Sequence, residues 1–89
     1  MDRLVKSLEF DPEGFEDLAW WVEQDRKKTL NILKLIKETQ RTPFTGTGQP
    51  KALKHELSGC WSRRTDQEHC LVYEVLDDKI RILAYRYHY

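Results

Sequence analysis

The side chains best suited to chemistry in this sequence are concentrated between Arg41 and Arg64. This stretch, RTPFTGTGQPKALKHELSGCWSRR, contains five lysine or arginine residues and a single acidic residue, Glu56, although the whole chain has 15 basic and 15 acidic residues. A local excess of positive charge suits a partner that carries phosphate groups. The alternative is an ordinary solvated loop followed by an exposed strand, because lysine and arginine are common on protein surfaces.

A second group of candidate residues is the C-terminal segment Arg86-Tyr87-His88-Tyr89. Histidine accepts or donates a proton near neutral pH without a shifted pKa. Tyrosine rings stack on nucleic acid bases, and their hydroxyl groups can bind a phosphate. The alternative for this segment is a frayed chain end without a function.

Together, the two groups meet the needs of a ribonuclease that uses no metal. In that reaction the ribose 2′-hydroxyl attacks the adjacent phosphate, so the site needs a base, an acid and positive charge near the phosphate oxygens. No set of acidic, histidine and cysteine residues has the spacing of metal ligands, so we predict neither a metal nor a cofactor. The side chains that we expect to bind RNA are His55, Trp61, Arg63 and Arg86.

The length and composition limit the overall organisation. A chain of 89 residues is expected to form one compact domain, over residues 1–89. Cys60 and Cys70 lack the close spacing of a metal or redox pair, so we expect two free thiols. The N-terminus lacks the apolar core of a signal peptide, and no apolar run approaches the ~20 residues that span a bilayer. We therefore expect a cytoplasmic protein with no membrane partner.

The first half of the chain predicts a strand and then a helix. Apolar residues alternate with polar ones near the N-terminus, which predicts a strand at about residues 3–10. Asp11 and Pro12 follow, and this pair is typical of a helix start, with the aspartate as N-cap. The next apolar residues recur at intervals of three and four, so they form a stripe that we expect to face the core. This stripe comprises Phe15, Leu18, Ala19 and Val22, with Trp20 and Trp21 at its edges.

A second helix and a loop complete this half. Apolar residues at helical spacing continue from Leu30 to about Thr39, and the interruption at 24–26 indicates a tight connection between two helices. Two helices joined in this way are expected to pack as a hairpin. Pro43 ends the second helix, because the residue before a proline disfavours the helical conformation. Phe44–Pro50 is then expected to be a loop.

The second half of the chain predicts an antiparallel sheet. Four short runs rich in β-branched and aromatic residues are separated by turn residues, and they cover positions 52–56, 60–65, 70–76 and 79–88. Alternation predicts the core-facing residues Leu71, Tyr73 and Val75, followed by Ile80, Ile82 and Ala84. The same alternation continues into Arg86 and His88, so we expect the core-facing side of the last strand to become polar near its end. This order of elements indicates the α+β class.

Several motifs in the second half resemble those of the YoeB toxins of the RelE superfamily. The matching segments are RTPF, LKH, LSG, WSRR, EH, LVY and the terminal RYHY, and the similarity extends over almost the whole chain. It implies a RelE-like fold, with an N-terminal strand and a two-helix hairpin packed on a mostly antiparallel β-sheet. It also implies a toxin of a type II toxin-antitoxin system that cuts messenger RNA in the ribosomal A site. The implied partners are the ribosome with its mRNA, a YefM-like antitoxin and a second copy of the chain.

The resemblance assigns roles to four residues. Lys54 and Arg64 match family residues that hold the phosphate and stabilise the transition state. His88 matches the general acid, and Tyr89 matches a terminal tyrosine that activity requires.

Two positions depart from the family pattern. Lys51 stands where the family has a glutamate that acts as the general base, and Cys70 stands where it has an arginine. We predict that Lys51 serves as the base, as a lysine does in the RelE branch, and Glu56 is the alternative. We predict that Cys70 lowers the turnover rate, because a thiol cannot replace the charge of an arginine.

Two further hypotheses stay open at this point. A catalytically weakened member of the family would act mainly by binding its antitoxin and regulating its own operon. A non-enzymatic RNA-binding domain would bind free RNA in a salt-sensitive manner without cutting it.

Overall fold

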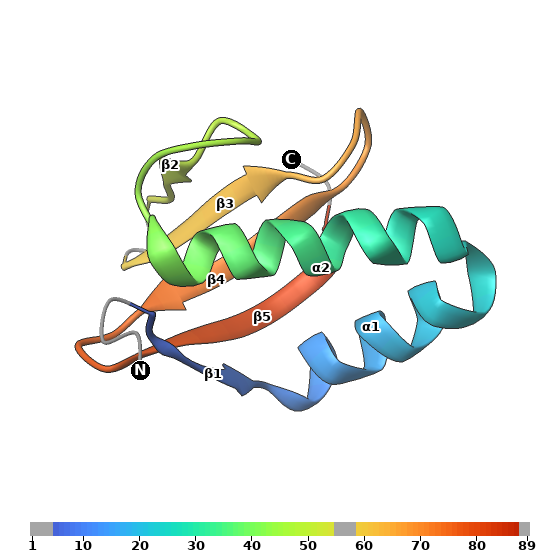
Figure 1. Cartoon of the computed structure of the whole chain (residues 1–89), viewed down its shortest axis with the longest axis horizontal. Helices are drawn as coiled ribbons and strands as arrows, with labels where there is room; N and C mark the ends of the chain where they lie inside the picture. Colours follow the sequence, from blue (N-terminus) through green and yellow to red (C-terminus); the bar gives the residue numbers. More distant parts are fainter. Residues whose placement is uncertain (1–4, 55–58, 88–89) are drawn as a thin grey trace.

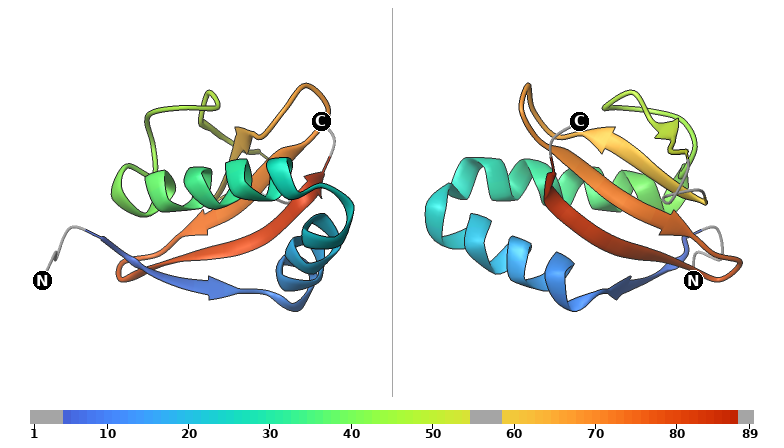
Figure 2. Two further views of the ribbon diagram at one scale, coloured as in Figure 1. Left: turned by 45° about the vertical axis from the view of Figure 1, so that its right-hand side comes forward. Right: turned by 180° about the vertical axis from the view of Figure 1, so that it is seen from behind.

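The computed structural model describes residues 5–54 and 59–87, and its helices and strands follow the predicted order. The elements are β1 (Ser7–Phe10), α1 (Pro12–Gln24), α2 (Arg26–Arg41), β2 (Lys51–Ala52), β3 (Cys60–Arg64), β4 (Cys70–Val75) and β5 (Lys79–Tyr87). The strands form one sheet in the order β1-β5-β4-β3-β2, and both helices lie on the same side of it (Figure 1). In the view from behind, β3, β4 and β5 lie in front of both helices (Figure 2). The predicted α+β class is confirmed.

The strands are mostly antiparallel, with one parallel pair. β2, β3, β4 and β5 pair antiparallel in sequence, whereas β1 lies parallel to β5, with Leu8 opposite Ile80. The described part of β1 is shorter than the predicted strand at 3–10, of which residues 3 and 4 lie outside the described ranges. β2 is also shorter than predicted, and positions 55 and 56 of that predicted strand lie outside the described ranges too.

The helical hairpin is confirmed, and Asp25 is the only residue between the two helices. The Asp25 carboxylate accepts a hydrogen bond from the backbone N–H of Lys28 at 3.0 Å, so it caps α2. The prediction that the Asp11 side chain caps α1 is wrong. Asp11 occupies the N-cap position but makes no side-chain capping bond, and its carboxylate lies 3.9 Å from Arg81 Nε. Within the described ranges, no helix has the length and apolar character to span a membrane.

The core lies between the helices and one face of β4 and β5. Its buried members are Trp21 of α1, Ile32, Leu35 and Ile36 of α2, and Leu71, Tyr73, Ile80, Ile82 and Tyr85 of the sheet. Val75 packs against this cluster, so the predicted inward face of β4 is confirmed. Burial of large apolar side chains supplies the main driving force for this packing, at roughly 25 cal/mol per Å² of apolar surface removed from water.

The predicted core face of α1 is wrong for three of the four residues in its stripe. Leu18 packs against the core, as do Trp20 and Trp21 at the edges, but Phe15, Ala19 and Val22 are exposed. The buried residues of this helix are Gly14, Asp17 and Trp21. Gly14 explains the rotation, because a Cβ atom at this position would lie 2.6 Å from the carbonyl oxygen of Ile82. The helix therefore approaches β5 along its glycine side, which leaves Phe15, Ala19 and Val22 on the outside.

The predicted alternation along β5 is also wrong beyond Ile82. Tyr73 lies opposite Ile82, but the next residue back on β4, Val72, lies opposite Ala84, so β5 contains an irregularity at this point. Tyr85 therefore enters the core cluster in place of Ala84. The carboxylate of Asp17 accepts the backbone N–H of Tyr85 at 3.1 Å, so a buried acid on α1 stabilises the irregular segment.

Candidate active site

A cleft of about 310 Å³ lies along β2, β3 and β4 where these strands meet the loop before β2. We call it the sheet cleft, and it is lined by Gly48, Gln49, Pro50, Lys51, Ser62, Arg64, Gln67, Glu68 and Cys70. Ser62 and Arg64 alternate along β3 with Trp61 and Arg63, whose side chains point toward the helices. This cleft therefore opens on the face of the sheet that the helices do not cover. Three residues singled out in the sequence, Lys51, Arg64 and Cys70, therefore meet in one cleft.

Backbone contacts between the loop and β3 position Lys51. Lys51 lies opposite Ser62 in the β2–β3 pair, and the N–H of Arg64 donates to the carbonyl oxygen of Gly48 at 2.7 Å. Gly48 has a φ of 88°, and a Cβ atom here would lie 2.8 Å from the carbonyl oxygen of Arg64. Only glycine tolerates both the positive φ and the close approach, so this position fixes how the loop leads into β2.

Arg64 and Cys70 lie directly opposite each other on β3 and β4. The Arg64 side chain is exposed, and its Nη1 donates to the carbonyl oxygen of Gln67 at 3.3 Å. Burial raises the pKa of the Cys70 thiol, and the positive charges of Arg64 and Lys51 offset only part of this rise. The thiol is therefore neutral at physiological pH and supplies no charge to the cleft.

Arg63 does not present its side chain to RNA, contrary to the sequence expectation. Its side chain is 0% exposed, and it lies on the helix side of β3. Its guanidinium donates to Tyr73 Oη (3.2 Å), Glu38 Oε2 (3.0 Å), and the carbonyl oxygens of Thr42, Thr45 (2.8 Å) and Thr47 (3.2 Å). Arg63 therefore holds the loop after α2, which continues into the sheet cleft.

Glu38 completes this anchor from the end of α2. Its carboxylate accepts the backbone N–H of Thr47 at 2.6 Å as well as the bond from Arg63. These two interactions, the Thr47 bond first, lower the pKa of Glu38 below its ordinary value. The carboxylate therefore stays ionised at neutral pH. Both members of the ion pair, Arg63 and Glu38, hold the loop through hydrogen bonds to its backbone.

Trp61 also lies on the helix side of β3. Its ring packs against the core and against Phe44, with the ring centroids 4.8 Å apart. It is partly exposed but does not line the sheet cleft. A contact between Trp61 and RNA would therefore lie outside this cleft, and it stays a prediction.

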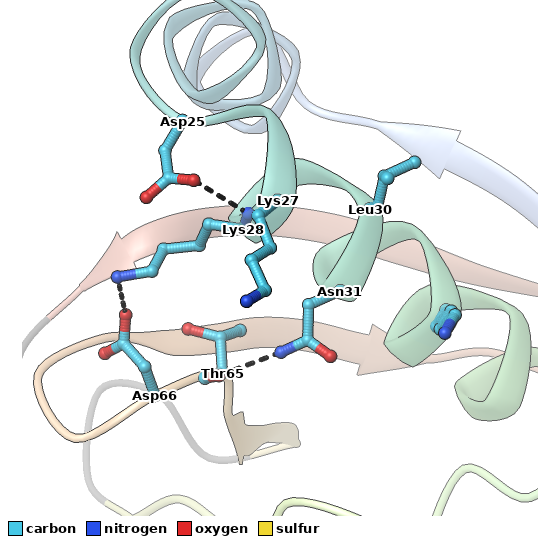
Figure 3. A pocket seen from close by; sticks show the side chains of 8 residues that line it. Asp25, Lys27, Lys28, Leu30, Asn31, Thr65 and Asp66 are labelled. Carbon is cyan, nitrogen blue, oxygen red and sulfur yellow. Dashed lines mark hydrogen bonds and ion pairs between the residues drawn. The ribbon is translucent and has the colours of Figure 1, made fainter.

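The turn between β3 and β4 is anchored to α2 (Figure 3). Lys28 forms an ion pair with Asp66 at 2.5 Å, and Asn31 donates to the carbonyl oxygen of Thr65 at 3.3 Å. Burial acts to raise the pKa of Asp66, but hydrogen bonds from Lys28 and from the backbone N–H groups of Glu68 and His69 outweigh it, so the pKa is strongly lowered. These contacts hold the turn that carries Gln67 and Glu68 into the cleft.

The remaining candidates are described only in part. Lys54 is exposed, two residues beyond the end of β2. His55, Glu56, His88 and Tyr89 lie outside the described ranges, and Arg86 is described only as part of the β5 backbone. Tyr87 pairs with Cys70, so β5 runs alongside the sheet cleft up to the residue that precedes His88.

Sequence reasoning missed four polar residues of the cleft, which are Gln49, Ser62, Gln67 and Glu68. Ser62 is buried at the base of the cleft, and Glu68 is exposed at its rim. Strand alternation with Arg64 could have placed Ser62 there. The position of Glu68 depends on the conformation of the β3–β4 turn, for which the sequence has no comparable signal.

Comparison with known proteins identifies the family. The sequence profile of the YoeB-like toxins of bacterial type II toxin-antitoxin systems matches residues 10–89. This chain belongs to the YoeB-like toxins. It is 51% identical to toxin YoeB of Mycobacterium bovis over 85 residues, which cover 96% of this chain and 100% of that protein. It is also 51% identical to toxin YoeB of Escherichia coli K12 over 82 residues, covering 92% and 98% of the two chains.

Solved structures of YoeB proteins confirm the RelE-like fold. The YoeB dimer structure from Staphylococcus aureus has a TM-score of 0.88 at 38% identity, and the match covers 99% of this chain and 100% of that one. The YoeB–YefM complex from the same organism has a TM-score of 0.85 at 38% identity, covering 94% and 98%. A YoeB/ParE toxin from Agrobacterium tumefaciens has a TM-score of 0.87 at 33% identity, covering 93% and 99%.

Proposed function

We propose that this YoeB-like toxin is a ribosome-dependent endoribonuclease that cuts mRNA in the A site by metal-free acid–base chemistry. The observation that carries the proposal is the convergence of Lys51 and Arg64 in a cleft that runs beside the end of β5. The two cations come from different strands, and the chain continues from β5 directly into His88 and Tyr89. We expect the reaction to take place in the cytoplasm, where the ribosomes are.

The proposed reaction forms one bond to phosphorus and breaks another. Lys51, as the neutral amine, removes the proton of the ribose 2′-hydroxyl, whose oxygen attacks the adjacent phosphorus. Lys54 and Arg64 stabilise the negative charge that develops on the phosphate oxygens. His88 donates a proton to the departing 5′-oxygen, and Tyr89 is also required for activity. The products are a 2′,3′-cyclic phosphate and a 5′-hydroxyl end.

The decisive experiment is a cleavage assay on ribosomes that carry a defined mRNA. The wild-type protein is expected to produce new mRNA 5′ ends within the A-site codon, detected by primer extension, and His88→Ala is expected to remove them. Cleavage of the same mRNA without ribosomes would contradict the ribosome-dependent part of the proposal. If no new ends form while the antitoxin still binds, the chain is a catalytically weakened toxin that acts by regulating its operon.

Replacement of Cys70 by arginine is expected to raise the cleavage rate. The present thiol is neutral in a cleft that needs positive charge, and one charge-stabilising group typically contributes a factor of 10²–10³. Because the new guanidinium enters a site shaped by cysteine, we expect a gain of about tenfold in single-turnover cleavage on programmed ribosomes. Cys70→Met, which adds bulk without charge, is the matched control. An equal rate in both variants would show that charge at position 70 does not limit the reaction.

We propose two protein partners in addition to the ribosome. The complex from Staphylococcus aureus contains YoeB and YefM, which supports a YefM-like antitoxin for this chain. The dimeric YoeB structure from the same organism supports self-association. Co-purification with a YefM-like antitoxin tests the first partner.

A further inference from the structure

Ser62 lies at the floor of the sheet cleft, beside the two side chains that give the cleft its positive charge. It is opposite Lys51 in the β2–β3 pair, and Arg64 follows it on the same face of β3. On its other side Ser62 is opposite Val72 of β4, which is buried and apolar. The strand therefore places a hydroxyl group on the floor, next to both cations.

The Ser62 hydroxyl differs from the other buried serine and threonine hydroxyl groups of the described residues. Ser62 is 2% exposed, and Thr29, Thr39 and Thr65 are also buried. Each of the three threonines donates to a backbone carbonyl oxygen, at distances of 2.9, 2.8 and 3.0 Å. The Ser62 hydroxyl has no hydrogen-bond partner within residues 5–54 and 59–87. Tyr85 Oη is also unpartnered, but its ring belongs to the apolar core, whereas Ser62 lines a cleft.

The geometry of a strand explains why this hydroxyl lacks a partner. In a helix, a threonine hydroxyl reaches the carbonyl oxygen four residues earlier, as Thr39 does. In a sheet, the backbone carbonyl groups point sideways and pair with neighbouring strands, away from the side chains. Buried polar groups in proteins are nearly always hydrogen-bonded, so an unpartnered one at the floor of a cleft indicates a contact with a ligand.

A phosphate group fits this floor. Lys51 and Arg64 neutralise its charge, and a serine hydroxyl donates to an anionic oxygen without adding a charge. Cys70, which lies opposite Arg64, offers only the weak donor of a thiol. Ser62 therefore supplies a stronger neutral donor than its neighbour on β4 does.

We propose that Ser62 is a further catalytic residue, whose hydroxyl donates a hydrogen bond to a nonbridging oxygen of the phosphate that is cut. The inference rests on the proposed function and adds a residue to its mechanism. Negative charge grows on the nonbridging oxygens as the 2′-oxygen attacks, so a donor fixed at the floor binds the transition state more strongly than the substrate. Ser62 keeps its proton and forms no covalent bond, because Lys51 and His88 carry out the two proton transfers.

The test combines Ser62→Ala with a sulfur substitution in the mRNA. Single-turnover cleavage is measured on ribosomes whose mRNA carries a phosphorothioate at the scissile linkage, with the two diastereomers separated. Sulfur accepts hydrogen bonds poorly, so the wild type is expected to cut more slowly the diastereomer that turns its sulfur toward Ser62. Ser62→Ala is expected to cut the ordinary mRNA roughly 100-fold more slowly, the usual loss for one such donor. The variant should also lose the extra slowing of that diastereomer, because both changes remove the same contact.

Measurements of stability separate this role from a structural one. Because the Ser62 hydroxyl has no partner among the described residues, Ser62→Ala is expected to keep the urea midpoint of the wild type. Thr39→Val is the matched control, since it removes a buried hydroxyl that does have a partner. It should lower the urea midpoint and leave the cleavage rate unchanged. Ser62→Thr keeps the hydroxyl on a residue that suits a strand, so it should recover most of the rate lost in Ser62→Ala.

The possible outcomes distinguish this inference from the proposed function. If the wild type cuts mRNA and Ser62→Ala cuts it equally fast, the inference is overturned and the proposed function stands. If Ser62→Ala is slow but keeps the full sulfur effect, the hydroxyl acts through Lys51 as a positioning group, and the proposed contact with the phosphate is wrong. A wild type with no sulfur effect on either diastereomer also contradicts that contact. If the wild type produces no new mRNA ends, the proposed function fails, and the catalytic role of Ser62 fails with it.

Discussion

Replacing Lys51 with alanine is expected to lower the rate of mRNA cleavage on programmed ribosomes by a factor of about 10²–10⁴, the usual contribution of a general base. Lys51 lines the sheet cleft, and its strand is held in place by the β2–β3 pairing and by the Gly48 contact to β3. Because Lys51 is exposed, the substitution should leave the free energy of unfolding within about 0.5 kcal/mol of the wild type. Single-turnover cleavage and urea unfolding measure the two quantities separately.

The most informative companion variant is Lys51→Glu, which restores the family's residue. A carboxylate is ionised at neutral pH and can accept the 2′-hydroxyl proton, so this variant is expected to cleave at least as fast as the wild type. Lys37→Ala, an exposed lysine on α2 outside the sheet cleft, is the control for a general loss of positive charge. If Lys51→Ala cleaves at the wild-type rate, the base lies elsewhere, and Glu56→Gln becomes the next variant to measure.

The adjacent arginines of β3 are expected to respond in opposite ways. Arg63→Met should lower the free energy of unfolding by about 3–5 kcal/mol, because it removes a partly buried ion pair with Glu38 and leaves three carbonyl oxygens without their donor. Arg64→Met should change stability little, because its side chain is exposed, but it should slow cleavage at least about 100-fold. Tryptophan fluorescence during urea unfolding reports the first effect and the ribosome assay reports the second.

This pair also tests whether the loop before β2 depends on its anchor. Arg63→Met should raise the rate of amide hydrogen exchange in residues 42–48, because Arg63 holds the carbonyl groups of this loop. Arg63→Lys is the conservative control, and it should recover only part of the stability, since a lysine cannot reproduce the five-donor fork. Equal urea midpoints for Arg63→Met and Arg64→Met would contradict the structural role of Arg63.

Local patterns in the sequence were sufficient for the elements of the fold. The strand, the two helices and the antiparallel runs follow from apolar periodicity and from turn residues, and the structure contains them in the same order. The local excess of positive charge was sufficient to place Lys51 and Arg64 in a basic stretch. The same periodicity misled at α1, because it identifies an apolar stripe without saying which side of the helix meets the sheet.

Tertiary contacts decided the features that depend on distant parts of the chain. Gly14 and Asp17 turn α1 toward β5, so the stripe with Phe15 and Val22 faces outward. The irregularity in β5 reverses the alternation after Ile82, which no local pattern predicts.

The composition and motifs of the sequence determined the fold class, the family and the basic character of the 41–64 stretch. Only the tertiary structure distinguished the roles of Arg63 and Arg64, the two adjacent arginines of this stretch. Because successive residues of a strand point to opposite faces, Arg63 is buried under the loop after α2 while Arg64 enters the sheet cleft with Lys51. The difference arises from what lies on each side of β3, the helices and their loop on one face and an open cleft on the other.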